Sequence, residues 1–562
     1  MCNKDELNSS LKQYFVNGDR ITAINNIFKY MNELYGHSSV YFDADRAMLK
    51  GEPGSYSRFL ENEEFPVGNS DAEGVLEQLA VYFQRAVQWE NPQTMINITP
   101  PANIVSIAAN AYVNLFNPNF AQDEPSGYLM TTELAVIKFL STLAGWDDKK
   151  SGGVFTFGGK GTNLYAGKMG LLKAMPSSRI DGISNSDVCI ISNEKSHPCH
   201  VEISDWLGIG RNACIKIPTD KDGRIIITEL ESVLRKKIES GEKIGCIIAN
   251  GGTTNEIIVD PIKQIVELRN KLVKEYALKY IPHVHVDSVI GWAWLNFKHY
   301  DFEKNRLNMT ENEKRKIKSL CDRISEVVYA DSFGVDFHKT GFCPYLSSCI
   351  MVKNINDLLS LGGKENTVDV SEMKYGEYSP FEWTLELTRS AHGPVSAYTA
   401  YKLFGAEGFQ ELIYNLFSSG EYIRKRLAED KEFEVINNDT EGFATLFVIL
   451  PPDDKRHYSD YVSADEGTVK TLLEYNNQFY LFLTDKFNKG EIGFRITFSK
   501  SYKPYGSKMK TGCLKIYQMS PVADKEDFGD IVKQIIELKK EYDMSSVVYK
   551  EDFAKPTDFV YR

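Results

Sequence analysis

The chain of 562 residues carries 65 Lys and Arg against 77 Asp and Glu, a formal net charge of −12 at pH 7. Nucleic-acid binding usually needs a concentrated basic patch, so this acidic balance argues against that class of partner. The nine cysteines lack CxxC or metal-ligand spacing, and no apolar run has the length of a membrane span or a signal-peptide core. We therefore expect reduced thiols, a cytoplasmic location and no metal site.

The first part of the chain, residues 1–110, shows helical and mostly polar patterns with loop signals such as GEPGS at 51–55. It carries apolar positions but no evident compact core of its own. We expect a separate N-terminal helical segment.

From 111 to 400, short apolar β-runs alternate with helical patterns. This alternation predicts an α/β fold, with a mostly parallel sheet covered by helices on both faces. A charged, helix-prone segment at 309–323 is expected to be a solvated surface insertion. The β-runs are DVCIIS at 187–192, IGCIIAN at 244–250, HVHVD at 283–287, EVVYAD at 326–331 and LSSCIMV at 346–352.

The last part of the chain, 401–562, predicts a smaller C-terminal domain. A long helical pattern at 401–427 leads into it. The runs ATLFVILPP at 444–452 and FRITFSK at 494–500 predict antiparallel strands, and DFGDIVKQIIELKKEY at 527–542 predicts a final helix.

Residues 152–174, GGVFTFGGKGTNLYAGKMGLLKA, form the pattern of a β-run, a Gly-rich turn and an amphipathic helix. Such a turn exposes backbone N–H groups at a helix N-terminus, where they and the helix dipole stabilise phosphate. The segment matches neither GxGxxG nor GxxxxGK[ST], so a dinucleotide or a nucleoside triphosphate is disfavoured. It predicts an anchor for a monophosphate.

Two further segments place polar side chains after β-runs. The segment SNEKSHPCHVEISDWLGIG at 192–210 contains His197, whose imidazole could stack on a flat cofactor ring or, alternatively, cap a helix or pack in the core. The run HVHVDSVIGW at 283–292 brings the carboxylate Asp287 to the carboxyl edge of the sheet, where open α/β sheets bind ligands.

The stretch ADSFGVDFHKTGF at 330–342 places Lys339 just past a strand, where its amine could form a Schiff base with a carbonyl. A pyridine ring carrying an aldehyde accepts electrons only when its ring nitrogen stays protonated, and pyridoxal phosphate enzymes supply an Asp for this and a Lys for the aldehyde. Asp287 and Lys339 would be that pair.

In this order the four segments resemble the group II pyridoxal-phosphate-dependent decarboxylases, the family of aromatic amino acid, tyrosine, glutamate and diaminobutyrate decarboxylases. The resemblance runs from about residue 95 to the C-terminus and includes TPPAN at 99–103 and ANGGTTNEIIVDPI at 249–262. It implies the aspartate-aminotransferase-like fold type I and a homodimer. The implied parts are an arm at 1–110, a large cofactor-binding domain at 111–400 and a small domain at 401–562.

The resemblance also implies roles for individual residues. Lys339 would carry the cofactor, Asp287 would pair with its ring nitrogen, and His197 would stack on the ring. His338 would lie beside the phosphate. The remaining implied cofactor contacts are Gly158, Gly159, Lys160, Gly161, Thr162, Asn163, Asn250, Ser288 and Ser332.

Three of these positions depart from the family pattern. Lys160 stands where a small hydroxyl residue is common, so a point charge could meet the phosphate. Asn250 replaces a threonine, and Ser288 replaces the usual alanine after the aspartate.

The implied reaction is loss of CO2 from an L-amino acid, followed by protonation at Cα. In the family a tyrosine on a loop after the lysine commonly gives that proton. The loop-like stretch 354–380 contains Tyr375 and Tyr378, and spacing favours Tyr375; the alternative is that both only line a surface loop.

The substrate is not evident from the motifs. An aromatic L-amino acid is preferred, because no cluster of spare arginines near the motifs demands a second substrate carboxylate. Glutamate or a diamino acid remains open. So do another pyridoxal phosphate activity, such as aldehyde synthase, lyase or aminotransferase, and a cofactor-binding protein without turnover.

Overall fold

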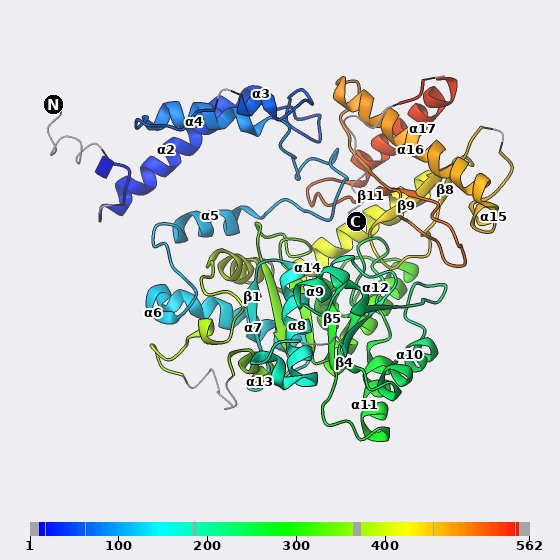
Figure 1. Ribbon diagram of the computed structural model, residues 1–562. Coiled ribbons are helices and arrows are strands. Elements are labelled where there is room, and N and C mark those ends of the chain that lie inside the picture. The colour runs from blue at the N-terminus through cyan, green and yellow to red at the C-terminus, as the bar shows by residue number, and fades with distance from the viewer. Residues whose placement is uncertain are drawn as a thin grey trace.

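A computed structural model describes residues 11–16, 18–61, 63–183, 187–363, 373–452, 454–545 and 547–549 (Figure 1). Its centre is a seven-stranded sheet with the order β1-β7-β6-β5-β4-β2-β3. The strands from β6 to β3 pair in parallel, and β7 runs antiparallel to both of its neighbours. The strands are β1 (Gly152–Thr156), β2 (Val188–Asn193), β3 (Cys214–Ile217), β4 (Lys243–Asn250), β5 (His283–Asp287), β6 (Ser332–Asp336) and β7 (Ser348–Val352).

Two apolar layers cover this sheet. Side chains alternate between the faces of a strand, so Ile247 of β4 packs in one layer and Ile248 in the other. The first layer contains α7 (Thr131–Ala144), α10 (Ile227–Glu239), α11 (Ile262–Glu275), α12 (Glu311–Ile324) and part of α14 (His392–Leu427). The second contains α8 (Gly159–Ala174), α9 (Cys199–Trp206) and α13 (Ile355–Leu359). Burial on both faces explains the continuous apolar runs of the strands, and the predicted fold class is confirmed.

A second, four-stranded antiparallel sheet follows in the chain, with the order β10-β11-β9-β8. Its strands are β8 (Phe433–Val435), β9 (Thr445–Ile449), β10 (Thr497–Ser499) and β11 (Cys513–Ile516), and its helices are α15 (Tyr458–Val462), α16 (Glu466–Asn488) and α17 (Lys525–Met544). The kinked α14 joins the two cores, because Phe409 packs under the large sheet while Ile423 packs with α16 and α17. The domain boundaries at 110 and 400 remain a prediction.

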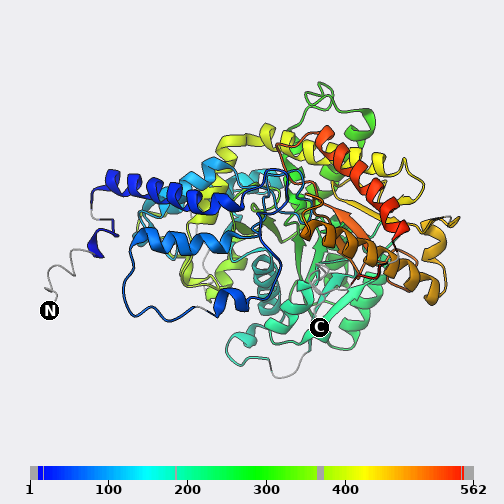
Figure 2. The same ribbon diagram turned by 90° about the horizontal axis from the view of Figure 1, so that it is seen from above.

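The N-terminal segment forms an arm of α2 (Arg20–Ser38), α3 (Ser57–Leu60) and α4 (Ala72–Ala80), followed by α5 (Ile104–Val113) and α6 (Asp123–Ser126). Helices α2 and α4 pack against each other, and Figures 1 and 2 show them extending along one side of the large-sheet body. No residue of α2 is buried. Among the described helices, none is both long and apolar enough to cross a membrane.

Short 3-10 helices complete the structure. They are η1 (Ser39–Tyr41), η2 (Val81–Phe83), η3 (Gly127–Met130), η4 (Pro176–Arg179), η5 (Arg211–Ala213), η6 (Gly291–His299), η7 (Ser325–Tyr329), η8 (Ser360–Gly362) and η10 (Pro380–Glu382).

The structure corrects three local expectations. The run 326–331 is not a strand: η7 ends there and β6 begins at Ser332, so tertiary packing overrides the β-propensity of Val and Tyr. The segment 309–323 is not fully solvated, because α12 buries Ile317, Leu320 and Ile324. A capping box at Thr310 begins this helix. The helix expected from 401 begins earlier, at His392.

Candidate active site

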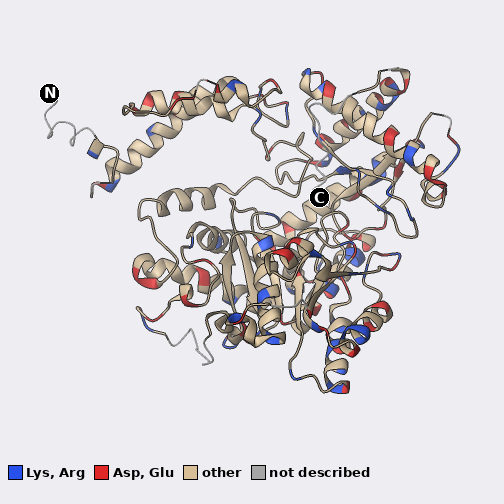
Figure 3. Ribbon diagram, viewed as in Figure 1, with Lys and Arg blue, Asp and Glu red and all other residues tan. Residues whose placement is uncertain are grey.

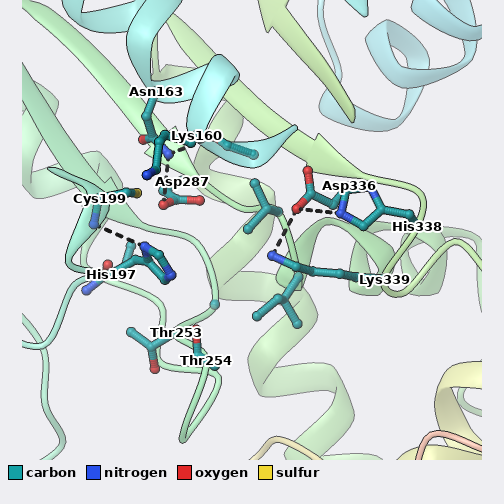
Figure 4. A pocket seen from close by; sticks show the side chains of 15 residues that line it. Lys160, Asn163, His197, Cys199, Thr253, Thr254, Asp287, Asp336, His338 and Lys339 are labelled. Atoms are coloured by element: carbon teal, nitrogen blue, oxygen red, sulfur yellow. Dashed lines mark hydrogen bonds and ion pairs between the residues drawn. The ribbon is translucent and has the colours of Figure 1, made fainter. Parts of the chain in front are cut away.

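A pocket of about 160 Å³ lies at the carboxyl edge of the large sheet. Strands β4, β5 and β6 end at Asn250, Asp287 and Asp336, and all three side chains line it. Because parallel strands end at one edge, residues distant in sequence meet there. The described residues that line it are Gly159, Lys160, Asn163, His197, Cys199, Asn250, Gly252, Thr253, Thr254, Asp287, Val289, Ile290, Asp336, His338 and Lys339 (Figure 4).

One wall of the pocket is the N-terminus of α8. Gly158 adopts a φ of 118°, a conformation that favours glycine, and its carbonyl accepts a hydrogen bond from the Gly161 N–H at 2.8 Å. Gly159 and Lys160, the first residues of α8, line the pocket, so the N-terminus of the helix, which stabilises an anion, lies at its edge. Gly158, Gly161 and Thr162 shape the turn without lining the pocket, and the Thr162 hydroxyl donates to the Gly159 carbonyl.

Lys160 is engaged by other side chains. Its amine forms an ion pair with Glu202 and lies 4.9 Å from the centroid of the Trp206 ring. The expected point charge for the phosphate is therefore partly neutralised within the chain.

Asp287 is held by two donors. Asn163 Nδ2 donates to Oδ2 at 3.1 Å, and His200 Nε2 lies 2.9 Å from the same oxygen. Since an ionised carboxylate only accepts, His200 carries its proton on Nε2, and its Nδ1 accepts from the Ser192 hydroxyl at 2.7 Å. Burial opposes ionisation of Asp287, but the His200 hydrogen bond and the neighbouring histidines together keep the pKa of the carboxyl below its usual value.

The other oxygen of Asp287, Oδ1, is buried and has no hydrogen-bond partner within the described structure. A buried acceptor without a partner is unusual and indicates a donor that binds from the pocket. Cys199 also lies near, and the ligand atoms of Cys199, His200 and Asp287 fall within 4.8 Å of one another. Burial raises the pKa of the Cys199 thiol, and His200 directs an N–H at the carboxylate, so hydrogen bonding explains this cluster better than a metal does.

Lys339 faces the pocket with its side chain 25% exposed. Its Nζ lies 2.9 Å from Oδ2 of Asp336 (Figure 4). Burial alone would lower the pKa of Lys339, but the Asp336 carboxylate raises it above the ordinary value. His338 is buried beside them, and its Nε2 lies 3.5 Å from Asp336 Oδ2.

His197 presents its ring to the pocket. The Cys199 N–H donates to its Nδ1 at 3.1 Å, which fixes the ring at the start of α9. The surrounding protein and the charge of Lys339 lower the pKa of His197 to about 4. The imidazole is therefore neutral at physiological pH and adds no positive charge to the pocket.

Four predicted residues lie elsewhere. Ser288 donates to the Gly334 carbonyl at 2.7 Å, and the Ser332 hydroxyl lies between His283 and His285, so neither lines the pocket. Tyr375 is 52% exposed and packs on Tyr128, with its hydroxyl donating to the Glu124 carbonyl at 3.4 Å. Tyr378 is buried in the layer that contains α8. Neither tyrosine lines the pocket of its own chain.

His200 and Asp336 contact Asp287 and Lys339 but were not predicted from the sequence. Asp336 stands in the motif with Lys339, so an ionisable side chain three residues before the lysine was a usable signal. His200 lies three residues after His197, and the sequence alone does not distinguish which imidazole faces Asp287.

The residues present fit pyridoxal phosphate. The unpartnered Oδ1 of Asp287 suits a protonated ring nitrogen, the N-terminus of α8 suits the phosphate, and the Lys339 amine suits the aldehyde. These three groups open on one pocket.

Comparisons with known proteins agree with this reading. The family model described as the pyridoxal-dependent decarboxylase conserved domain matches residues 53–448. The aromatic-L-amino-acid decarboxylase of Bacillus atrophaeus is 22% identical over 86% of this chain and 88% of its own. The acidic amino acid decarboxylase of Xenopus tropicalis is 23% identical over 65% of this chain and 66% of its own, just under two thirds of that relative.

Solved structures show the same fold. The crystal structure of mouse CSAD has a TM-score of 0.73 and 18% identity, over 91% of this chain and 98% of that one. Oryza sativa TDC with PLP and tryptamine has a TM-score of 0.70 and 15% identity, over 96% and 99%. The family match confirms the expected enzyme class and cofactor at the level of the family. The chain belongs to the pyridoxal-dependent decarboxylase family.

Proposed function

We propose that this protein decarboxylates an L-amino acid to the corresponding amine and CO2. The observation that carries the proposal is the pairing, across one pocket, of the Lys339 amine with the unpartnered Oδ1 of Asp287. Family membership makes decarboxylation the best-supported reaction for this pair.

Pyridoxal phosphate supplies an electron sink for the electron pair left at Cα when CO2 departs. Asp287 would hold the proton on its ring nitrogen, with His200 and Asn163 keeping the carboxylate ionised and oriented. The N-terminus of α8 and His338 would bind the phosphate. The neutral ring of His197 would fix the plane of the cofactor, and this plane decides which bond at Cα breaks.

Lys339 would hold the aldehyde carbon until the amine of the substrate replaces it. The hydroxyls of Ser288 and Ser332 bond to the Gly334 carbonyl and to His285, so neither would contact the cofactor directly. Ser288 would support the site through the backbone, and Ser332 through His285. Tyr375 would donate the proton to Cα only if the loop moves or if a second copy brings it to a pocket.

The proposed substrate is an aromatic L-amino acid. No arginine belongs to the described pocket wall, so nothing there favours a second substrate carboxylate. The Bacillus atrophaeus relative, which aligns over most of both chains, is named for aromatic substrates. Relatives named for acidic amino acids and for L-2,4-diaminobutyrate keep those substrates as alternatives. Another pyridoxal phosphate activity, such as aldehyde synthesis, is the alternative reaction.

The proposed assembly is a homodimer, with α2 and α5 in the interface. Both helices leave apolar side chains exposed, among them Phe28, Met31, Ile104 and Tyr112. Helix α5 contains no charged residue, and Figure 3 shows it entirely in tan below the arm. The proposed location is the cytoplasm, supported by the eight buried thiols of the described cysteines.

The test is a panel of L-amino acids, with CO2, amine, aldehyde and hydrogen peroxide measured for each. Borohydride reduction and peptide mapping should locate the cofactor on Lys339. Lys339→Ala should lose the adduct and turnover, while Lys160→Ala keeps the adduct. An adduct on Lys160, or aldehyde as the main product for every amino acid, would refute the proposal in its site or its reaction respectively.

A further inference from the structure

Asp336 stands directly against the proposed cofactor-binding lysine. It is 1% exposed and ends β6, three residues before Lys339. Its Oδ2 lies 2.9 Å from Lys339 Nζ, and its Oδ1 accepts from the Ser348 hydroxyl at 2.5 Å. Ser348 is the partner of Asp336 in the β6–β7 pairing, so the sheet itself holds the carboxylate in place.

The surrounding chain is shaped to the same carboxylate. A Cβ atom at Gly159 would lie 2.8 Å from Asp336 Oδ2, closer than real Cβ contacts allow. Glycine at this position therefore admits both the first turn of α8 and the carboxylate beside it. A helix N-terminus also stabilises a nearby negative charge.

We propose that Asp336 is a positioning residue that holds the Lys339 amine as an ammonium ion whenever this amine is not joined to the cofactor. The inference rests on the role of Lys339 proposed above. The other ionisable groups that face Lys339 are His338 beside it, Asp287 at the end of β5, His197 before α9 and Tyr345 before β7. Among the described residues, Asp336 supplies the carboxylate that lies within ion-pair distance of Lys339 Nζ.

The protonation state of Lys339 affects how fast its amine joins the aldehyde of the cofactor. The ammonium must first release a proton to solvent. The neutral nitrogen then adds to the aldehyde carbon, a C=N bond forms and the aldehyde oxygen leaves as water. In the reverse exchange, the amine of the substrate takes over the carbon, and the released lysine nitrogen takes up a proton. By favouring the charged amine, Asp336 slows attachment and favours release.

The test begins with the wild-type protein without cofactor. Competitive acetylation at a series of pH values, followed by mass spectrometry, measures the fraction of each lysine that is neutral. Lys339 should become reactive at a higher pH than the exposed Lys279, which serves as the reference. If Lys339 reacts at the same or a lower pH than Lys279, the inference is overturned without any variant.

Two variants then separate charge from packing. Asp336→Asn keeps the shape and removes the charge, and an opposite charge at this distance shifts a pKa by about one to three units. Lys339 acetylation and pyridoxal phosphate attachment at pH 7 should both become about tenfold faster or more. Ser348→Ala keeps the charge and should change both rates by less than about threefold.

Each outcome decides one question. An unchanged acetylation profile in Asp336→Asn, or an equal shift in Ser348→Ala, overturns the role of the charge. If acetylation shifts as expected but pyridoxal phosphate attaches to another lysine, the ion pair stands and the proposed function of Lys339 fails.

Discussion

The Nε2 atom of His200 lies 2.9 Å from Oδ2 of Asp287, and this contact leaves Oδ1 of the carboxylate for the pocket. The histidine is fully buried and neutral, and its second nitrogen is fixed by Ser192. His200 therefore orients Asp287 and keeps it ionised without adding a charge. Partners of this kind behind a binding group typically change affinity by about tenfold or more when removed.

For Asp287 itself, Asp287→Asn should still bind the cofactor on Lys339 but lose the charge that holds the ring-nitrogen proton. A buried charge-assisted hydrogen bond contributes on the order of 2–4 kcal/mol, so turnover should fall by about 30- to 1000-fold. Near-normal turnover would remove Asp287 from the mechanism.

His200→Phe should weaken pyridoxal phosphate binding by about tenfold, because Asn163 alone then orients the carboxylate. The measurement is cofactor titration by absorbance. Ser192→Ala is the matched control, since it removes the second bond of His200 but leaves the imidazole in place, and its effect should be smaller. Equal losses in both variants would indicate a general disturbance of β2 rather than a role at Asp287.

The sequence predicted the position of side chains best at the ends of strands, where Asp287 and Lys339 line one pocket. Asp287 and Lys339 follow apolar runs, and parallel strands necessarily bring such residues to one edge. The prediction was weaker for residues whose role depends on orientation: Ser332 precedes the lysine motif yet turns toward His283 and His285, and His200 faces Asp287 although His197 was the named histidine. A one-dimensional pattern identifies the strand but does not determine which neighbour a side chain meets.

Acid should destabilise the protein through its buried histidines. Burial lowers the pKa of His285 to about 3, well below the ordinary value near 6.5. The unfolded chain therefore takes up a proton below pH 6.5 that the folded chain refuses. The contribution of neutral His285 to the free energy of unfolding is complete above that pH and falls as the pH drops toward 3. Between pH 7.5 and 5.5, His285 should contribute a loss of about 1.4 kcal/mol.

Denaturant unfolding of the cofactor-free protein at the two pH values measures this loss. His285→Gln should reduce the difference between the two pH values by about 1.4 kcal/mol, whatever its effect on absolute stability. His299→Gln, at an exposed histidine, should leave the wild-type difference in place. An undiminished difference in His285→Gln would assign the acid sensitivity to other groups.

The arm should be needed for dimerisation. Phe28 on α2 is 60% exposed in the single chain, and burying such a side chain contributes about 2–3 kcal/mol. Phe28→Asp should therefore raise the dimer dissociation constant by at least about 30-fold in sedimentation experiments. Lys29→Ala, at the neighbouring exposed position, is the control. Deleting residues 1–90 should give insoluble or inactive protein, and a well-behaved active monomer would contradict the proposed interface.

Tyr375 provides the sharpest separation between decarboxylase and aldehyde synthase. If its hydroxyl donates the proton to Cα, Tyr375→Phe should still release CO2, but the electron pair at Cα then lacks its donor. Reaction with O2 and water gives aldehyde, ammonia and hydrogen peroxide in place of amine. The amine yield should fall while aldehyde and peroxide rise together.

The structure makes this prediction more demanding, because Tyr375 packs on Tyr128 outside the pocket of its own chain. In mixed dimers of Tyr375→Phe and Lys339→Ala, one subunit keeps Lys339 and the other keeps Tyr375. These dimers should regain amine formation if the tyrosine acts on the pocket of the second copy. They should remain without it if the loop closes within one chain. Tyr378→Phe is the matched control, since that side chain is buried, and it should change stability more than product ratio. Should Tyr378→Phe alone switch the product, the role moves to Tyr378. If neither variant changes the ratio, the proton comes from elsewhere, with His197 the next candidate because its ring already faces the pocket.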